Sequence, residues 1–327
     1  MAKWGIVGSG FITRAMLDAI ALNEGSTAQC IFGRTAETRD ALQAEYGTAH
    51  ATDSYQELLQ NPEVEAVYIG LPNHLHKDYS LEALAAGKAV LCEKSLTVTM
   101  SDASALVAGA EKAQTFFAEG LMYLSHPMHH KLLDLLRTGR FGQLRHVQGF
   151  YAADIWQVVN PAGGGTLYNL GCYPASLLHL VVQAMCGEDA FANRQLQASG
   201  NAGHDGNLRD TAVTVRFDNG VLATLHSTDG YGMAHEFTIA TDLGTLRFDS
   251  NPWLPAPQGN SFTWTPYEGT PERFVADSGY DAFFHQLQMV EAAMAAGETQ
   301  AKRPSPRLRD SAEIMQFLTD WQAAVTT

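Results

Sequence analysis

A glycine-rich segment near the start of the chain contains the first residues whose types and spacing suit a specific chemistry. Gly8-Ser9-Gly10-Phe11-Ile12-Thr13 follows the apolar run Trp4–Val7 and precedes apolar residues at helical spacing. At a strand-to-helix junction, glycines permit a tight turn and a close backbone approach to phosphate, and the helix N-terminus offers N–H donors. The segment therefore predicts a dinucleotide site, and the expected contacts are Gly8, Ser9, Gly10, Phe11 and Ile12.

The end of the second apolar run indicates which dinucleotide is bound. This run ends in Ile31-Phe32-Gly33-Arg34-Thr35, and no acidic residue stands at the place that would hold a ribose 2′-hydroxyl. A guanidinium there suits a 2′-phosphate instead. We therefore predict NADP as cofactor, with NAD as the alternative, and Arg34 and Thr35 as contacts. The other interpretation, that Arg34 is a solvated loop charge, stays open.

Composition excludes several classes of protein. The chain has 327 residues, enough for about two domains, and 46% of them are hydrophobic. The 21 basic residues against 35 acidic ones give a net charge of −14, which argues against a nucleic-acid partner. No apolar stretch approaches the roughly 20 residues of a membrane span. The four cysteines lack metal-binding spacing, so we expect no metal and a cytoplasmic location.

The elements that must hold these residues follow two different patterns. Over residues 1–122, short apolar runs alternate with helical segments, which predicts a doubly wound parallel sheet. From Tyr123 onward the pattern changes, and residues 123–327 are expected to form an α+β domain. A period-two segment with a turn at Asp218-Asn219-Gly220 predicts an antiparallel hairpin there. The strands expected in the first domain are Trp4–Val7, Ala28–Phe32, Ala66–Ile69, Ala89–Cys92 and Thr115–Ala118.

Further motifs follow later strands and connect the chain to a known family. They are Leu71-Pro72-Asn73-His74-Leu75-His76, the stretch Gly87–Lys94, and the stretch Gly163–Tyr173. With these motifs the chain resembles the glucose-fructose oxidoreductase, inositol dehydrogenase and MocA (Gfo/Idh/MocA) family. The resemblance is strongest to the branch of dimeric dihydrodiol and NADP-dependent D-xylose dehydrogenases. It implies a Rossmann domain at 1–122 and, at 123–327, a substrate-binding domain with a large, mostly antiparallel open sheet that forms a homodimer or higher oligomer.

The resemblance also implies which residues hold the cofactor. The family's Glu-Lys-Pro motif corresponds to Glu93-Lys94-Ser95, in which the lysine contacts the nicotinamide ribose and the substrate hydroxyl. Ser95 replaces the proline, which puts the placement of Lys94 in question. Leu124 replaces an arginine found in relatives, so we expect one cofactor or substrate contact to be lost. The further cofactor contacts implied are Leu71, Pro72, Asn73, His74, His76 and Glu93.

The stretch Gly163–Tyr173 implies the acid–base chemistry. Tyr173 takes the position of the proton-transferring residue, and Asn169 replaces an aspartate one helical turn earlier. A tyrosine with a pKa near 10 needs a neighbouring cation to act as a base at neutral pH, and we expect Lys94 to supply it. We interpret Asn169 as a substitution that adjusts the electrostatics of the site and is compatible with catalysis. The implied reaction is hydride transfer between NADP and a sugar, diol or related polyhydroxylated small molecule.

Other interpretations remain open at this stage. Trp156 is expected to stack on a sugar ring and His126 to contact substrate, although a core aromatic is nearly as plausible for Trp156. The spacing of His126, His129 and His130 also fits a metal site, which we consider the weaker interpretation. The fold further hosts nicotinamide-retaining glycosidases and non-catalytic dinucleotide sensors. Retained Lys94 and Tyr173 favour an oxidoreductase.

Overall fold

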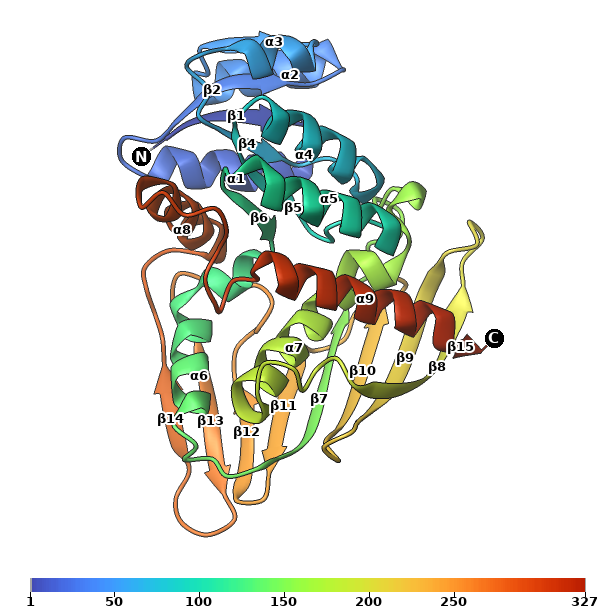
Figure 1. Cartoon of the computed structure of the whole chain (residues 1–327). Helices are drawn as coiled ribbons and strands as arrows, with labels where there is room; N and C mark the ends of the chain where they lie inside the picture. Colours follow the sequence, from blue (N-terminus) through green and yellow to red (C-terminus); the bar gives the residue numbers. More distant parts are fainter. Residues whose placement is uncertain (1, 327) are drawn as a thin grey trace. The chain divides into compact units, whose positions relative to one another are not determined.

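The computed structural model describes residues 2–326, which divide into two compact units (Figure 1). The first unit comprises residues 1–122 and 283–312, and the second comprises 123–282 and 313–327. The boundary between Met122 and Tyr123 coincides with the boundary expected from the sequence. The sequence pattern assigns 283–312 to the second domain, but this segment groups with the first unit instead.

The first unit is built on a parallel sheet. Among the described residues, six strands lie in the order β3-β2-β1-β4-β5-β6, and every neighbouring pair is parallel. This confirms the predicted doubly wound sheet. The strands are β1 (Lys3–Val7), β2 (Thr27–Phe32), β3 (His50–Thr52), β4 (Ala66–Ile69), β5 (Ala89–Glu93) and β6 (Phe117–Gly120). The helices are α1 (Phe11–Leu22), α2 (Ala36–Tyr46), α3 (Tyr55–Gln60), η1 (Asn73–Leu75), α4 (His76–Ala85), α5 (Met100–Ala113) and α8 (Ala282–Ala295).

Apolar packing explains why 283–312 joins the first unit. Phe284, Leu287 and Val290 of α8 belong to the same buried cluster as Trp4 and Ile6 of β1 and the inner side of α1. The Trp4 indole N–H also donates to Glu291 Oε1 at 3.0 Å. Burying an apolar helix face stabilises by about 25 cal/mol per Å², which holds α8 on this sheet despite its distance in sequence.

The second unit contains a larger sheet. Within residues 123–326, nine strands lie in the order β14-β13-β12-β11-β7-β10-β9-β8-β15. Two neighbouring pairs, β7 with β10 and β8 with β15, are parallel, and the other pairs are antiparallel, as predicted. The strands are β7 (Leu144–Ala152), β8 (Arg194–Ala202), β9 (Leu208–Phe217), β10 (Leu222–Thr228), β11 (Glu236–Thr241), β12 (Gly244–Phe248), β13 (Ser261–Pro266), β14 (Glu272–Val275) and β15 (Val325–Thr326).

Helices cover one face of this second sheet. Helix α7 packs on β7 and β10, and α6 packs on α7. The strands alternate accordingly: Val213 and Val215 of β9 are buried, whereas Thr214, paired with Thr224 of β10, is exposed on the other face. Figure 1 shows α6 and α7 lying along the same side of the sheet. The helical segments are η2 (Met122–Ser125), α6 (Pro127–Arg137), η3 (Pro161–Gly163), η4 (Leu167–Gly171), α7 (Cys172–Cys186) and α9 (Leu308–Ala324). The first residues of α9, 308–312, group with the first unit.

No helix within residues 2–326 combines the length and the apolar character needed to cross a bilayer.

Candidate active site

The glycine turn connects β1 to α1. Gly8 has φ +110°, and a Cβ there would lie 2.7 Å from the Gly70 carbonyl oxygen, so the tight turn requires glycine. Gly10 is the N-cap of α1, and the space around its Cβ position is open within 4 Å. Thr13, which stands where such fingerprints have a third glycine, is buried and donates from Oγ1 to Gly8 O at 3.2 Å. The threonine side chain therefore connects the first turn of α1 to the glycine turn.

The N-terminus of α1 retains the properties of an anion site. No side chain caps it, and its first turn contains no acidic residue. Ser9 Oγ lies 2.9 Å from Thr38 Oγ1, which links the turn to α2. Phe11 is 89% exposed. Free N–H groups at a helix start attract phosphate through hydrogen bonds and the helix dipole.

Arg34 lies exposed in the short connection between β2 and α2. It forms no ion pair with any residue from 2 to 326. Gly33 beside it allows close packing against Ser9, because a Cβ there would lie 3.2 Å from Ser9 Oγ. The sequence analysis missed Arg39, whose guanidinium donates to Gly33 O at 3.1 Å. Two guanidinium groups thus flank this connection, and that of Arg34 is open to an anion.

The segment after β4 contains the other expected cofactor contacts of the first unit. Leu71 and Pro72 are partly exposed and His74 is exposed, whereas Asn73 is buried. His76 differs from the expectation, because its ring is fully buried. Its Nδ1 lies 2.8 Å from Ser95 O and its Nε2 lies 2.7 Å from Leu71 O. The geometry gives His76 a role in linking backbone segments rather than in direct cofactor contact.

Lys94 follows the end of β5 and is partly buried. The bond between Lys94 and Ser95 is cis. The preceding Glu93 is buried, and its carboxylate accepts from Tyr68 Oη at 2.9 Å and from the Lys94 N–H at 3.3 Å. Burial raises the pKa of Glu93, and the charge of Lys94 opposes this rise. The Glu93 carboxylate therefore restrains the main chain of Lys94 from the strand side.

In the second unit, Tyr173 lies at the start of α7 directly after a π-helical turn, η4. The sequence predicted an α-helical relation between Asn169 and Tyr173, and π-turns are frequent at functional sites. Gly165 precedes this turn with φ +77°, and a Cβ there would lie 2.5 Å from Leu208 O. Thr166 Oγ1 lies 2.8 Å from Ser227 Oγ of β10. These contacts set where the helix that carries Tyr173 begins.

An aromatic cluster surrounds Tyr173. The ring centroid of Tyr173 lies 5.1 Å from Tyr151, 5.5 Å from Tyr123 and 6.3 Å from Trp253. Tyr123 Oη donates to Tyr173 O at 3.1 Å. Burial raises the pKa of Tyr151 to about 12, and its hydroxyl forms no hydrogen bond with any residue from 2 to 326. Tyr151 and Trp253 were not predicted from the sequence. The position of Tyr151 near the end of a strand could have indicated that it lies at the site.

Trp156 is 40% exposed, and its partners were not predicted. The Arg209 guanidinium lies 4.2 Å from the indole centroid. Both residues line a small recess with the buried Asp229, which lies 3.8 Å from Arg209 Nε. Burial raises the pKa of Asp229 to about 6. One face of the Trp156 indole is thus occupied by a cation within the same unit.

The histidines of α6 take structural positions. His126 is fully buried as the N-cap of α6, accepts from the Met128 N–H at 3.2 Å, and lies 3.3 Å from Ser278 Oγ. This differs from the substrate contact expected for His126. His129 packs between the rings of Tyr123 (4.8 Å) and Phe248 (5.6 Å). Together with His130 they form no metal-binding group within residues 2–326.

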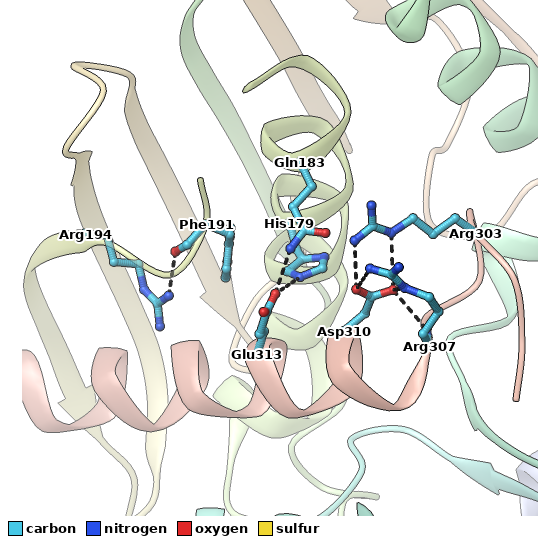
Figure 2. Close-up of polar contacts among 8 residues, drawn as sticks. All are labelled: His179, Gln183, Phe191, Arg194, Arg303, Arg307, Asp310 and Glu313. Atoms are coloured by element: carbon cyan, nitrogen blue, oxygen red, sulfur yellow. Dashed lines mark hydrogen bonds and ion pairs between the residues drawn. The ribbon is translucent and has the colours of Figure 1, made fainter. Parts of the chain in front are cut away.

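Side-chain hydrogen bonds hold the second half of α7, away from the first turn that carries Tyr173. Glu313 Oε2 lies 2.8 Å from His179 Nε2 and accepts from Gln183 Nε2 at 2.7 Å (Figure 2). In the first unit, the same figure shows the guanidinium groups of Arg303 and Arg307 next to the Asp310 carboxylate, and they donate to its Oδ1 at 2.8 and 2.9 Å. Buried carboxylates need such partners to remain charged.

The residues of the first unit fit a nicotinamide dinucleotide. The uncapped α1 N-terminus and the open space at Gly10 suit a pyrophosphate, and exposed Arg34 suits a further phosphate. When bound, such a cofactor supplies the hydride acceptor or donor for a redox reaction.

Comparison with known proteins covers both units. Residues 2–121 match the family model described as "Oxidoreductase family, NAD-binding Rossmann fold", and residues 129–247 match the "GFO/IDH/MocA C-terminal domain". An uncharacterised oxidoreductase from Rhizobium meliloti is 31% identical over 96% of this chain and 87% of its own. A 1,5-anhydro-D-fructose reductase from Ensifer adhaerens is 29% identical over 69% of each chain.

Further relatives agree with both the predicted branch and the predicted fold. A trans-1,2-dihydrobenzene-1,2-diol dehydrogenase from Xenopus tropicalis is 24% identical over 77% of each chain. The solved structure of a 3-ketoreductase from Actinomadura kijaniata, in complex with NADP and TDP-benzene, superimposes with a TM-score of 0.85 at 22% identity, covering 99% of this chain and 98% of that one. The chain is an oxidoreductase and belongs to the Gfo/Idh/MocA family.

Proposed function

We propose that the protein is an NADP-dependent oxidoreductase that interconverts a CH–OH and a C=O group of a sugar, a diol or a related polyhydroxylated small molecule. Family membership supports the reaction type. Among the relatives, the anhydrofructose reductase and the dihydrobenzenediol dehydrogenase support the substrate class. The 3-ketoreductase structure, which contains NADP, agrees with the cofactor.

One observation carries the cofactor preference. Exposed Arg34 follows β2 and has no ion-pair partner within residues 2–326, beside a connection packed against the glycine turn. A guanidinium there would bind the 2′-phosphate with two parallel hydrogen bonds, each stronger than a bond between neutral groups. NADP should therefore bind more tightly than NAD.

The chemical roles fall to Lys94 and Tyr173. In oxidation, the hydroxyl proton would pass to the Tyr173 phenolate as the C=O bond forms, and bound NADP⁺ would supply the acceptor for the hydride of the broken C–H bond. The Lys94 ammonium holds the substrate oxygen and stabilises negative charge on it. In reduction, Tyr173 returns the proton. Asn169 contributes hydrogen bonding without charge, so it does not oppose the phenolate.

The aromatic side chains are proposed as substrate contacts. Tyr151 presents a hydroxyl without a partner in the described chain, next to the Tyr173 ring. A phenol of this kind can bind a sugar hydroxyl, and indole or phenol faces pack against the C–H face of a sugar ring. Trp156 keeps its proposed stacking role through the face that Arg209 does not cover.

We also propose a homodimer formed through the second sheet. The face opposite α6 and α7 carries uncharged polar side chains, such as Gln197, Thr214 and Thr224, on three adjacent strands, and these side chains line a recess. In a twofold dimer this surface of one subunit would face the same surface of its partner.

A binding titration followed by a substrate screen tests the proposal. Cofactor-stripped protein is titrated with NADPH and with NADH by fluorescence, and the expected result is a markedly lower Kd for NADPH. Aldoses, diols and anhydrosugars are then screened with NADP⁺ for absorbance at the reduced-nicotinamide band. Equal affinities would refute the cofactor preference, and the absence of turnover across the screen would refute the substrate class.

A further inference from the structure

Two buried titratable side chains hold the backbone that follows Lys94. His76, the first residue of α4, lies 2.8 Å from the Ser95 carbonyl oxygen through Nδ1. Glu119, on β6, accepts from the Leu96 N–H through Oε1 at 2.8 Å. The exposed fraction is 0% for His76 and 2% for Glu119. Two different elements of the first unit therefore hold consecutive residues of one short segment.

The burial of these groups opposes their charged forms. Desolvation lowers the pKa of His76 to about 4 and raises the pKa of Glu119 to about 7. Apolar residues of the same volume would fill these positions without that penalty. Because such groups are costly to bury, their direct hydrogen bonds to the main chain after Lys94 point to a local requirement for precise backbone placement.

The same imidazole also reaches a second segment. His76 Nε2 lies 2.7 Å from the Leu71 carbonyl oxygen, and Leu71 follows β4. Ser95 follows β5, the neighbour of β4 in the parallel sheet. Ligands of doubly wound sheets bind at the carboxyl ends of the strands. With its pKa lowered to about 4 the ring is neutral and has a single N–H, so it donates to one of these two carbonyl oxygens and lies against the other, at the sheet edge where the cofactor is expected.

Glu93 restrains the opposite side of Lys94. Its carboxylate accepts from Tyr68 Oη at 2.9 Å and from the Lys94 N–H. Glu93 therefore holds the main chain on the N-terminal side of Lys94, and the partners of Ser95 and Leu96 hold it on the C-terminal side. A lysine side chain is long and flexible, and a fixed backbone origin limits the volume that its ammonium samples.

We propose that His76 and Glu119 are positioning residues, which place the Lys94 ammonium for the reaction by fixing the backbone of Ser95 and Leu96. The proposal rests on the proposed function, because it assumes that Lys94 acts on the substrate oxygen. It assigns no contact with substrate to either residue.

Matched variants separate positioning from general stability. His76→Phe keeps an aromatic ring and removes both ring nitrogens, whereas His76→Gln keeps an amide donor. Glu119→Leu removes the acceptor, and Glu119→Gln keeps it. Leu84→Ala is the control: Leu84 is buried on α4, at the opposite end of the helix from His76.

The expected result is a split between turnover and nucleotide binding. His76→Phe and Glu119→Leu should each lower kcat by roughly 10- to 100-fold, as misplacement by about 1 Å does in other enzymes. His76→Gln, Glu119→Gln and Leu84→Ala should stay within about 3-fold of the wild-type kcat. The Kd of 2′,5′-ADP, which lacks nicotinamide, should be unchanged in all of them. A kcat for His76→Phe equal to that of Leu84→Ala would overturn the proposal.

A double-mutant cycle tests whether His76 acts through Lys94. Adding His76→Phe to Lys94→Ala should lower kcat by less than about 2-fold, because the group being positioned is already absent. If the two losses multiply, His76 acts independently of Lys94 and the proposal is wrong.

Backbone NMR keeps the test valid if no substrate is found. The Leu96 amide proton should be shifted downfield by its bond to the Glu119 carboxylate. It should move upfield in Glu119→Leu, and the Ser95 and Leu96 signals should change in His76→Phe but not in Leu84→Ala. Unchanged signals would refute the positioning proposal. Changed signals without turnover on any polyol would leave positioning supported and refute the proposed function instead.

Discussion

Glu119 gives a quantitative prediction about stability and pH. Its carboxyl group is buried on β6, and desolvation raises its pKa from 4.5 to about 7 against the opposing effects of Ser311 and of the Leu96 N–H, which donates to Oε1. Since the pKa is higher in the folded state, the folded protein holds a proton that the unfolded chain releases between pH 4.5 and 7. Stability from this group is therefore present below pH 4.5 and is lost as the pH rises to 7.

The magnitude follows from the size of the pKa shift. One pKa unit corresponds to about 1.4 kcal/mol, so a rise from 4.5 to about 7 corresponds to a loss of roughly 3 kcal/mol above pH 7. Glu119→Gln removes the titration and keeps an oxygen that accepts from the Leu96 N–H. We expect the variant to match the wild type near pH 4.5 and to be more stable by about 3 kcal/mol at pH 8.

Urea unfolding measures this difference directly. Free energies of unfolding are determined for the wild type and Glu119→Gln between pH 4.5 and 8.5, with equal m-values as a condition for comparing them. Subtracting the two curves cancels the titrating groups that do not interact with Glu119, whereas Glu93 and Lys94, which interact with it, contribute to the difference. A difference that stays constant over this pH range, or that favours the wild type at pH 8, would refute the assignment of a raised pKa to Glu119.

Three other predictions concern function and assembly. Lys94→Ala and Tyr173→Phe should each lower kcat by about 100-fold or more, with unchanged circular dichroism, as removal of an acid–base or electrostatic group does; near-normal turnover in both would contradict the proposed mechanism. Arg34→Ala should raise the Kd of NADPH by roughly 10- to 100-fold and leave that of NADH unchanged, since a charge-assisted hydrogen bond contributes about 1.5–3 kcal/mol; equal losses in the two titrations would count against phosphate recognition. Thr214→Arg combined with Thr224→Arg should yield a monomer in light scattering after gel filtration, because like charges would meet across the twofold axis; an unchanged mass would exclude this face as the interface.

Local sequence patterns were sufficient for much of the first unit. The apolar run, the glycines and the following helical spacing predicted β1, the turn and α1, because the signals for a strand-to-helix junction lie within a few residues of Gly8. The close approach of the Gly70 carbonyl oxygen to Gly8 was not predictable from that pattern. The hairpin around Asp218-Asn219-Gly220 was predictable for the same reason, and β9 pairs with β10 as expected. The sequence did not predict the short strand β3, which pairs with β2 over only three residues.

Residues that act through distant contacts escaped prediction. His76 was expected to touch cofactor and His126 substrate, yet the His76 ring is buried between two carbonyl oxygens and His126 caps α6. Tyr151 and Trp253, from separate parts of the chain, meet beside Tyr173 with centroids 6.0 Å apart. Their convergence depends on how strands far apart in sequence align, which no local pattern specifies.

The sequence by itself determined the types of residue available for chemistry and the local turns that expose them. It specified the glycine turn, the guanidinium after β2, the lysine after β5 and the tyrosine that opens α7. Only the tertiary structure decided that α8 completes the core of the first sheet and that His76 and Glu119 hold the segment after Lys94. The physical reason is that turns and caps depend on backbone groups a few residues apart, whereas burial and its pKa shifts depend on every element packed around a side chain.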